Sequence, residues 1–296
     1  MAVETILEGR NGHTVTIGPD HPFAVIGERI NPTGRKSLGP EFVAGDFSRA
    51  ISDARAQVEA GARVLDVNAG IPGADEPAIL VDVIKAVQSV TDVPICIDSS
   101  TFEALEPALQ AVEGKPLLNS VTGEDEALER VLPLVKRYGC AVIGMANDDT
   151  GISMEVDERF AAAAKIVEAA VSYGIPKEDV IIDPLAMPVG AATAAPAAAL
   201  TTLKIVKRVR EELDVNLSCG ASNTSFGLPD RHGIDAAFLP MLMTLGMACT
   251  ITNPLAADVR RAILAADVLL DHDEYSMEWV KYYRAREAAS QETPPK

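Results

Sequence analysis

Polar side chains stand where four short apolar segments of this chain end. The residues are Asp98, Asn119, Asp183 and Asn223. They are hydrogen-bonding groups rather than nucleophiles or a metal-ligand set, because carboxylates accept and amides both donate and accept. A carboxylate can accept two parallel N–H bonds at once, which suits the edge of a flat, nitrogen-rich heterocycle. Their types and positions therefore predict an enzyme site that binds such a ring.

A lone Asp at the end of an apolar segment is more often a helix cap than a functional group. Asp98, however, is followed by hydroxyl residues at 99–101, which serve as caps more naturally. Asp183 precedes Pro184, which favours extended backbone and aims the Asp side chain off the segment end. We therefore expect both carboxylates to be available to a ligand.

Eight apolar segments alternate with eight stretches of helical period. The segments, which we expect to be buried parallel strands, are residues 24–31, 63–70, 94–100, 116–121, 141–148, 180–185, 215–223 and 248–254. The helical stretches are residues 47–62, 76–90, 102–112, 124–139, 158–174, 194–213, 232–246 and 257–271, the first with Ser48 as its expected cap. Eight alternations predict an α/β protein with a closed (β/α)8 TIM barrel, whose polar strand ends meet at one face.

A doubly wound open sheet is the alternative fold. It would carry a glycine fingerprint after an early strand, and residues 27–39, GERINPTGRKSLG, do not match one. Residues 5–18 alternate around an Asn-Gly pair and predict a β-hairpin that plugs the bottom of the barrel. Residues 274–289 predict a terminal helix. The domain prediction is thus a hairpin extension over 1–22 and a barrel over 23–290.

Composition excludes several classes of function. The formal net charge of −17 argues against sequence-independent nucleic-acid binding, which needs clustered Lys and Arg. No apolar stretch is long enough to span a bilayer, and the N-terminus lacks a signal-peptide pattern, so we expect a cytoplasmic protein. The scattered histidines predict no bound metal, and the cysteines predict buried free thiols. These last residues are His13, His21, His232, His272, Cys96, Cys140, Cys219 and Cys249.

Six short motifs follow one another in barrel order. They are GERIN at 27–31, LDVNAG at 65–70, CIDSS at 96–100, LLNSV at 117–121, IDPL at 182–185 and GASN at 220–223. Together they resemble the pterin-binding methyltransferases, specifically the methyltetrahydrofolate:corrinoid-protein methyltransferases. The folate-binding module of cobalamin-dependent methionine synthase is related. The resemblance covers about residues 23–272, nearly the whole expected barrel.

The resemblance implies a role for each site residue. Asp98, Asn119 and Asp183 would hold the pterin ring by its hydrogen-bonding edge. Asn223 would reach N5, the atom that carries the methyl group, and would be the catalytic residue. The remaining substrate-binding residues would be Gly220 and Ser222 around N5, Asp66 and Asn68 deeper on their strand, Glu28 and Asn31 at the floor or rim, and Arg231 near the pterin.

The implied reaction moves a methyl group between N5 of tetrahydrofolate and the cobalt of a corrinoid. A methyl group leaves a tertiary amine only if that nitrogen gains a proton or strong hydrogen bonding. An amide does not titrate, so Asn223 would stabilise the protonated N5 rather than supply the proton. The chain has no DxHxxG run to hold a corrinoid, so a partner protein is expected to bring it. The resemblance also implies a homodimer.

Three other functions stay open. Dihydropteroate synthases carry a Lys- and Arg-containing signature after two late strands, whereas PLAMPVG at 184–190 and ASNTSFG at 221–227 contain neither. A Schiff-base aldolase needs a Lys at a strand end. The candidate lysines, Lys85, Lys115, Lys136, Lys165, Lys204 and Lys207, all lie on expected helices or before strands. The sequence does not exclude a folate-binding protein without catalysis, and it assigns no role to the acidic loop 146–156.

Overall fold

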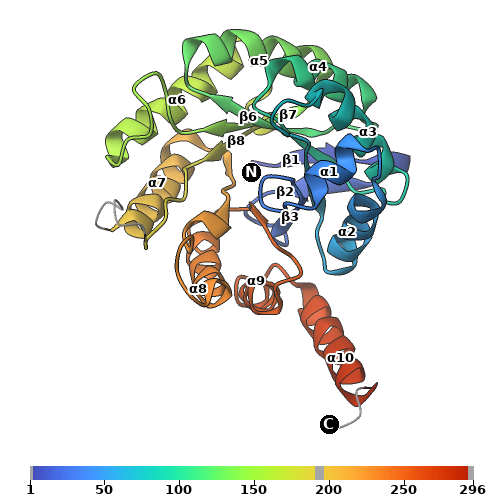
Figure 1. The fold of residues 1–296 in the computed structure, drawn as a ribbon. Coiled ribbons are helices and arrows are strands. Elements are labelled where there is room, and N and C mark those ends of the chain that lie inside the picture. Colours follow the sequence, from blue (N-terminus) through green and yellow to red (C-terminus); the bar gives the residue numbers. More distant parts are fainter. Residues whose placement is uncertain (1–2, 191–196, 293–296) are drawn as a thin grey trace.

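The computed structural model describes residues 3–190 and 197–292. Within them, eight parallel strands form one sheet in the order β10-β3-β4-β5-β6-β7-β8-β9. The strands are β3 (Ala24–Ile30), β4 (Val64–Asn68), β5 (Ile95–Asp98), β6 (Leu117–Thr122), β7 (Ala141–Met145), β8 (Val180–Asp183), β9 (Asn216–Leu217) and β10 (Cys249–Thr252). A bridge between Gly220 and Ile251 joins the two end strands. The predicted TIM barrel is confirmed (Figure 1).

Helices surround the sheet on its outside (Figure 1). They are α2 (Ser48–Glu59), α3 (Glu76–Gln88), α4 (Phe102–Ala111), α5 (Asp125–Tyr138), α6 (Val156–Ser172), α7 (Ala198–Leu213), α8 (Arg231–Met243) and α9 (Ala257–Leu269). Each overlaps a predicted helix. Residues 194–196 of the predicted seventh helix lie outside the described residues. The short helix α1 (Leu38–Val43) was not predicted.

The predicted Ser48 cap is wrong, because the N-cap position of α2 is Phe47, whose side chain makes no capping hydrogen bond. Ser48 is the first residue of α2, and its backbone N–H donates to Asp46 Oδ1 at 3.0 Å. The Asp side chain therefore takes one of the amide groups that has no partner within the helix, which is what a capping group does.

Side chains alternate between the barrel interior and the helix layer along each strand. In β3, Ala24 and Ile26 pack in the interior cluster, whereas Val25 packs in the outer cluster under the helices. Both faces of these strands are therefore apolar, as buried parallel sheets require. All four cysteines are free and buried, as predicted.

The N-terminal hairpin closes the bottom of the barrel, as predicted. Its strands β1 (Thr5–Glu8) and β2 (Thr14–Ile17) pair antiparallel. Leu7, Val15 and Ile17 are at most 1 % exposed and belong to the interior cluster. Asn216, the first residue of β9, donates from Nδ2 to Thr5 Oγ1 at 2.9 Å and to the Ile17 carbonyl at 2.8 Å. The plug therefore sits at the strand amino ends, opposite the predicted site.

The last helix, α10 (Met277–Glu292), leaves the barrel beside α9 (Figure 1). It begins three residues later than predicted, because Tyr275 and Ser276 have positive φ angles of 53° and 55°. Asp273 caps it by accepting from the amides of Glu278 and Trp279 at 3.0 and 2.9 Å. Among the described residues, no helix combines the length and apolarity needed to cross a membrane.

Candidate functional site

Three predicted site residues lie side by side on neighbouring strands. Asn68, Asp98 and Asn119 are register partners on β4, β5 and β6, at the carboxyl edge of the barrel. Asn68 Nδ2 donates to Asp98 Oδ2 at 3.0 Å, and Asn31 reaches the same oxygen at 3.5 Å. The prediction that Asn68 lies deeper on its strand is wrong. The parallel register places the ends of β4 and β5 at the same height, so Asn68 is level with Asp98.

A second carboxyl group lies below Asp98. Asp66 is only 2 % exposed and accepts from Asn119 Nδ2 at 3.2 Å. Burial, and then the charge of Asp98, raise the pKa of Asp66 well above its usual range. Burial also raises the pKa of Asp98 to about 6, against hydrogen bonds that lower it. The proton of this pair therefore resides preferentially on Asp66, and Asp98, nearer the barrel mouth, is the member that ionises more readily.

Asp183 faces the mouth from the end of β8. Its Oδ1 accepts from the amide of Leu185 at 2.7 Å, and Leu185 has a φ of 60°. Burial raises the pKa of Asp183 to about 6, while the amides of Leu185 and Gly220 and the nearby Arg159 lower it. The chain thus presents two carboxylates that are ionised at neutral pH but sit in an environment that disfavours their charge.

Arg159 on α6 holds together the two loops beside Asp183. Its side chain is only 1 % exposed and donates to the carbonyls of Pro184 and Leu185 at 2.8 and 2.7 Å, and to that of Ser153 at 2.5 Å. The first two carbonyls belong to the β8–α7 connection, and the third to the acidic loop 146–156. The acidic loop is thereby fastened to the backbone that orients Asp183.

Asn223 lies on the loop between β9 and α8, at the end of a single 3-10 turn. Its side chain is exposed at the mouth. A side chain on Gly220 would place its Cβ 2.9 Å from Asn223 Nδ2, so it would displace the Asn223 amide from its present position. Ser222 Oγ donates to Glu28 Oε2 at 3.1 Å. This bond joins the loop to the end of β3.

Arg231 contacts the loop rather than the Asp98 and Asp183 side chains. It donates from Nε to Ser225 Oγ at 3.1 Å and from Nη2 to the Ser222 carbonyl at 2.5 Å. Asp235, one turn further along α8, is 2 % exposed, and its Oδ1 has no hydrogen-bond partner among the described residues. Burial raises the pKa values of both Asp235 and Glu28. Contact between Arg231 and a pterin stays a prediction.

Sequence reasoning missed Arg159 and Asp235, although a signal was present. Each is a charged residue on the buried face of its helix, Arg159 in the first turn of α6 and Asp235 in the second turn of α8. Arg159 is followed by buried Ala162, Ala163 and Ile166 at offsets of three, four and seven. A charge at such a position is unusual. A charged side chain at such a position indicates that its hydrogen-bond partners lie on neighbouring loops, as they do for Arg159.

No lysine lies among these strand-end residues in the described part of the chain. Lys115, which comes nearest to a strand, precedes β6 at the opposite, hairpin end and pairs with Asp179 at 2.5 Å. None of the strand-end residues described above is therefore the lysine that a Schiff-base aldolase needs.

Known proteins share both the sequence pattern and the fold. A methylcorrinoid:tetrahydrofolate methyltransferase of Eubacterium limosum is 30% identical over 266 residues, covering 88% of this chain and 96% of that protein. Dihydropteroate synthase from Xanthomonas albilineans with 4-aminobenzoic acid superposes with a TM-score of 0.68 at 21% identity, covering 87% of this chain and 96% of that one. Dihydropteroate synthase from Thermus thermophilus superposes with a TM-score of 0.65 at 24% identity, covering 89% of this chain and 99% of that one.

The likeness to the two synthases supports the barrel fold alone. A family model described as pterin binding enzyme matches residues 27–253, from the strand that carries Glu28 to the end of β10. The match therefore begins within β3 and includes the other seven strands of the barrel, and this chain belongs to the family of pterin-binding enzymes.

Proposed function

We propose that this protein transfers a methyl group between N5 of tetrahydrofolate and the cobalt of a corrinoid carried by a partner protein. The proposal is supported above all by the position of Asp98, Asn119 and Asp183 on strands of one parallel barrel, with the exposed Asn223 on the loop after β9. The name of the Eubacterium limosum relative supports the same reaction.

The strand-end carboxylates fit the pterin edge. A pterin presents paired N–H donors on one side of a flat ring, and Asp98 and Asp183 are acceptors whose charge is poorly solvated. Ligand N–H groups that replace this missing solvation form charge-assisted bonds, which are stronger than neutral ones. Asn119 keeps a carbonyl oxygen for the ring while its Nδ2 is held by Asp66. These three residues orient the ring and leave N5 toward Asn223.

Asn223 acts at the reacting nitrogen. Its amide hydrogen-bonds N5 more strongly as that nitrogen becomes protonated, and this selective stabilisation makes the amine a better leaving group. The Ser222–Glu28 bond and the two Arg231 bonds hold the loop that carries the amide. A corrinoid in its cobalt(I) state supplies the nucleophile that accepts the methyl group. The reverse transfer uses the same contacts.

The corrinoid protein would approach from the loop side of the barrel. Exposed apolar residues stand on the loops there: Ile152 after β7, Val189 after β8 and Phe226 after β9. The Val189 amide donates to the Thr224 carbonyl at 3.0 Å, so the last two loops are joined. Exposed apolar side chains around a polar site are typical of a surface that receives a protein.

Asn223→Ala tests the proposed reaction. Folate affinity should fall only moderately, and methyl transfer to a reduced corrinoid, followed by its absorption spectrum, should slow by about 10²–10³. Asn11→Ala, in the hairpin loop at the far end of the barrel, should change neither. An Asn223→Ala rate equal to that of the unmodified protein would rule out the catalytic role. A wild-type protein that binds methyltetrahydrofolate without turnover would instead favour a folate-binding protein.

We also propose that the protein is a cytoplasmic homodimer. Leu269 on α9 is 85 % exposed and Met241 on α8 is 47 % exposed, and apolar side chains this open are stabilised when a second chain covers them. Sedimentation at micromolar concentration should give twice the mass of 31.3 kDa, and Leu269→Glu should shift the protein toward monomer. A wild-type monomer at that concentration would contradict the proposal.

A further inference from the structure

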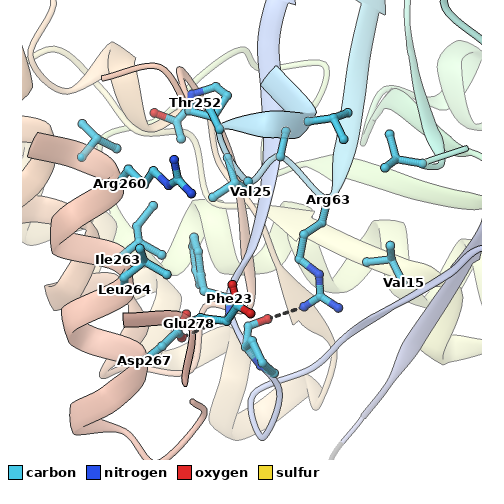
Figure 2. Close-up of a pocket in the computed structure, with 18 of the residues that line it drawn as sticks. Val15, Phe23, Val25, Arg63, Thr252, Arg260, Ile263, Leu264, Asp267 and Glu278 are labelled. Atoms are coloured by element: carbon cyan, nitrogen blue, oxygen red, sulfur yellow. Dashed lines mark hydrogen bonds between the residues drawn. The ribbon is translucent and has the colours of Figure 1, made fainter. Parts of the chain in front are cut away.

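A pocket of about 500 Å³ opens on the outside of the barrel, where its first and last βα units meet. We call it the seam pocket. Its lining includes Phe23, Val25, Arg63, Arg260, Ile263 and Leu264 (Figure 2). The strand β3 separates it from the barrel interior, because Val25 faces the pocket while Ala24 and Ile26 face inward. The seam pocket is therefore distinct from the candidate functional site.

The floor of the seam pocket is apolar. Phe23 directly precedes β3 and Val25 is the second residue of that strand. Ile263 and Leu264 come from α9 on the facing side (Figure 2). On the α2 side the wall is built from the small residues 60–62, which leave the space between the helices open. A concave, mostly apolar cavity of this size matches the volume of small-molecule sites, which is about 300–1,000 Å³.

Two arginines enter this apolar pocket from opposite walls (Figure 2). Arg63 makes one hydrogen bond, from Nη1 to the Pro22 carbonyl at 2.9 Å. Burial lowers the pKa of Arg63. Arg260 lies with its guanidinium carbon 5.0 Å from the centre of the Tyr282 ring. Among the described residues neither arginine forms an ion pair, although the chain has 43 Asp and Glu against 26 Lys and Arg.

Three acidic residues line the seam pocket, Asp267, Asp273 and Glu278, and each has another partner; Glu278 lies 3.6 Å from Lys281 Nζ. Asp267 Oδ1 accepts from the Phe23 amide at 3.1 Å and lies 3.4 Å from His272 Nδ1. Asp273 caps α10 with both of its oxygens. Arg63 is thus a partly desolvated cation, because burial lowers its pKa more than the nearby Asp267 charge raises it. Among the described residues no carboxylate lies within ion-pair distance of either guanidinium, and an anion that enters the pocket offsets the cost of partly buried charge.

We propose that the seam pocket binds a small amphipathic carboxylate. Its apolar body packs on Val25, Ile263 and Leu264, and its carboxylate meets Arg63 and Arg260. The combination is specific: an uncharged apolar compound leaves the guanidinium groups unpaired, and a small hydrophilic anion leaves the apolar floor in contact with water. Since the ligand contacts both the α2–β4 connection and α9, binding also stabilises the closure of the barrel.

Decanoate and decanol are the probes for calorimetry on the full chain. They share the apolar body and differ in the carboxylate. Decanoate should bind at least tenfold more tightly than decanol. Arg63→Gln and Arg260→Gln should each weaken decanoate binding by roughly 10- to 100-fold. Arg261→Gln is the matched control, because Arg261 is the next residue of α9, is exposed and pairs with Asp258 at 2.8 Å.

Leu264→Trp tests the cavity without changing any charge. The larger side chain should fill the seam pocket and abolish decanoate binding, while melting without ligand shows that the variant is folded. Methyltetrahydrofolate affinity should be unchanged in all four variants, so this test is independent of the proposed reaction. No decanoate binding to the wild type, equal binding of decanol, or an equal loss in Arg261→Gln would each overturn the proposal.

Discussion

At the scale of single residues, the candidate site consists of carboxyl groups kept where their charge is poorly solvated. Asp98 and Asp183 have pKa values of about 6 because burial outweighs the hydrogen bonds they accept. Folding therefore sustains a cost at neutral pH that a ligand with N–H donors can offset. At these two positions the charge that serves ligand binding lowers the stability of the fold. A substitution that removes the charge should therefore change folate affinity and stability in opposite directions.

Asp183→Asn should stabilise the protein while weakening folate binding. A carboxyl whose folded pKa is about 6, above its ordinary 3.8, stabilises the fold below pH 4 and loses that contribution as the pH rises through 6. Asn keeps an oxygen for the Leu185 amide and carries no charge. Its gain in unfolding free energy should thus be larger at pH 8 than at pH 4, by about 1–3 kcal/mol. Urea titrations at both pH values measure this, and equal differences would contradict it.

Folate affinity should fall as the pH drops through 6. Protonated Asp98 and Asp183 lose acceptor capacity, so each group can contribute up to about tenfold per pH unit below its pKa. Calorimetry between pH 5 and pH 8 measures the profile. The double variant Asp98→Asn with Asp183→Asn is the control, and its weaker affinity should vary much less. A wild-type affinity that is flat over this range would refute the assignment of these carboxylates to the ligand.

At the scale of elements, the loops of the carboxyl edge are fastened by buried side chains rather than by their own sequences. Arg159 joins the acidic loop 146–156 to the β8–α7 connection. The Ser222–Glu28 bond joins the β9–α8 loop to β3. The loops that surround the site are therefore positioned by donors and acceptors that lie on other elements.

Arg159→Met should loosen the site and lower stability together. It leaves three carbonyls without donors and removes a positive charge near Asp183, so unfolding free energy should fall by about 2–4 kcal/mol. Folate affinity should fall by roughly tenfold or more, and the pH midpoint of binding should move upward. Arg159→Lys should recover part of each loss. Arg137→Met, at an exposed pair with Glu106, is the control and should cost less than about 1 kcal/mol.

At the scale of the whole molecule, the barrel is closed at one end and open at the other. The hairpin fills the amino end with Leu7, Val15 and Ile17, while the carboxyl end keeps polar side chains. Stability is thereby concentrated at the end opposite the site. The site can hold poorly solvated carboxylates because the rest of the barrel is packed.

Leu7→Ala should lower unfolding free energy by about 2–4 kcal/mol, because it removes a fully buried side chain from the barrel interior. Ile6→Ala is the matched control, since Ile6 is the preceding residue on the same strand and is 48 % exposed. It should cost less than about 1 kcal/mol. Denaturant titration measures both, and folate affinity should be unchanged in each. Equal losses in the two variants would contradict the plug.

The fold could be predicted because local patterns carry it. Apolar segments six to nine residues long, each followed by a helical stretch, specify the alternation of a (β/α)8 barrel. The Asn-Gly pair at residues 11–12 marked the hairpin, since both residues adopt positive φ angles of 54° and 72°. Asp98, Asn119 and Asp183 were visible for the same reason, because they interrupt apolar segments: Asp98 and Asp183 are the last residues of β5 and β8, and Asn119 follows the two buried leucines that begin β6.

Tertiary structure alone decided the rest. The Asp66–Asp98 pair depends on strand register, which no single strand encodes. The contacts of Arg159 depend on two loops that are brought beside α6 only when the barrel forms. The seam pocket depends on how α2 and α9 diverge where the barrel closes. Sequence patterns report which face of an element is buried, but partners distant in the chain are set by packing, so charges on buried helix faces acquire a meaning only in the folded protein.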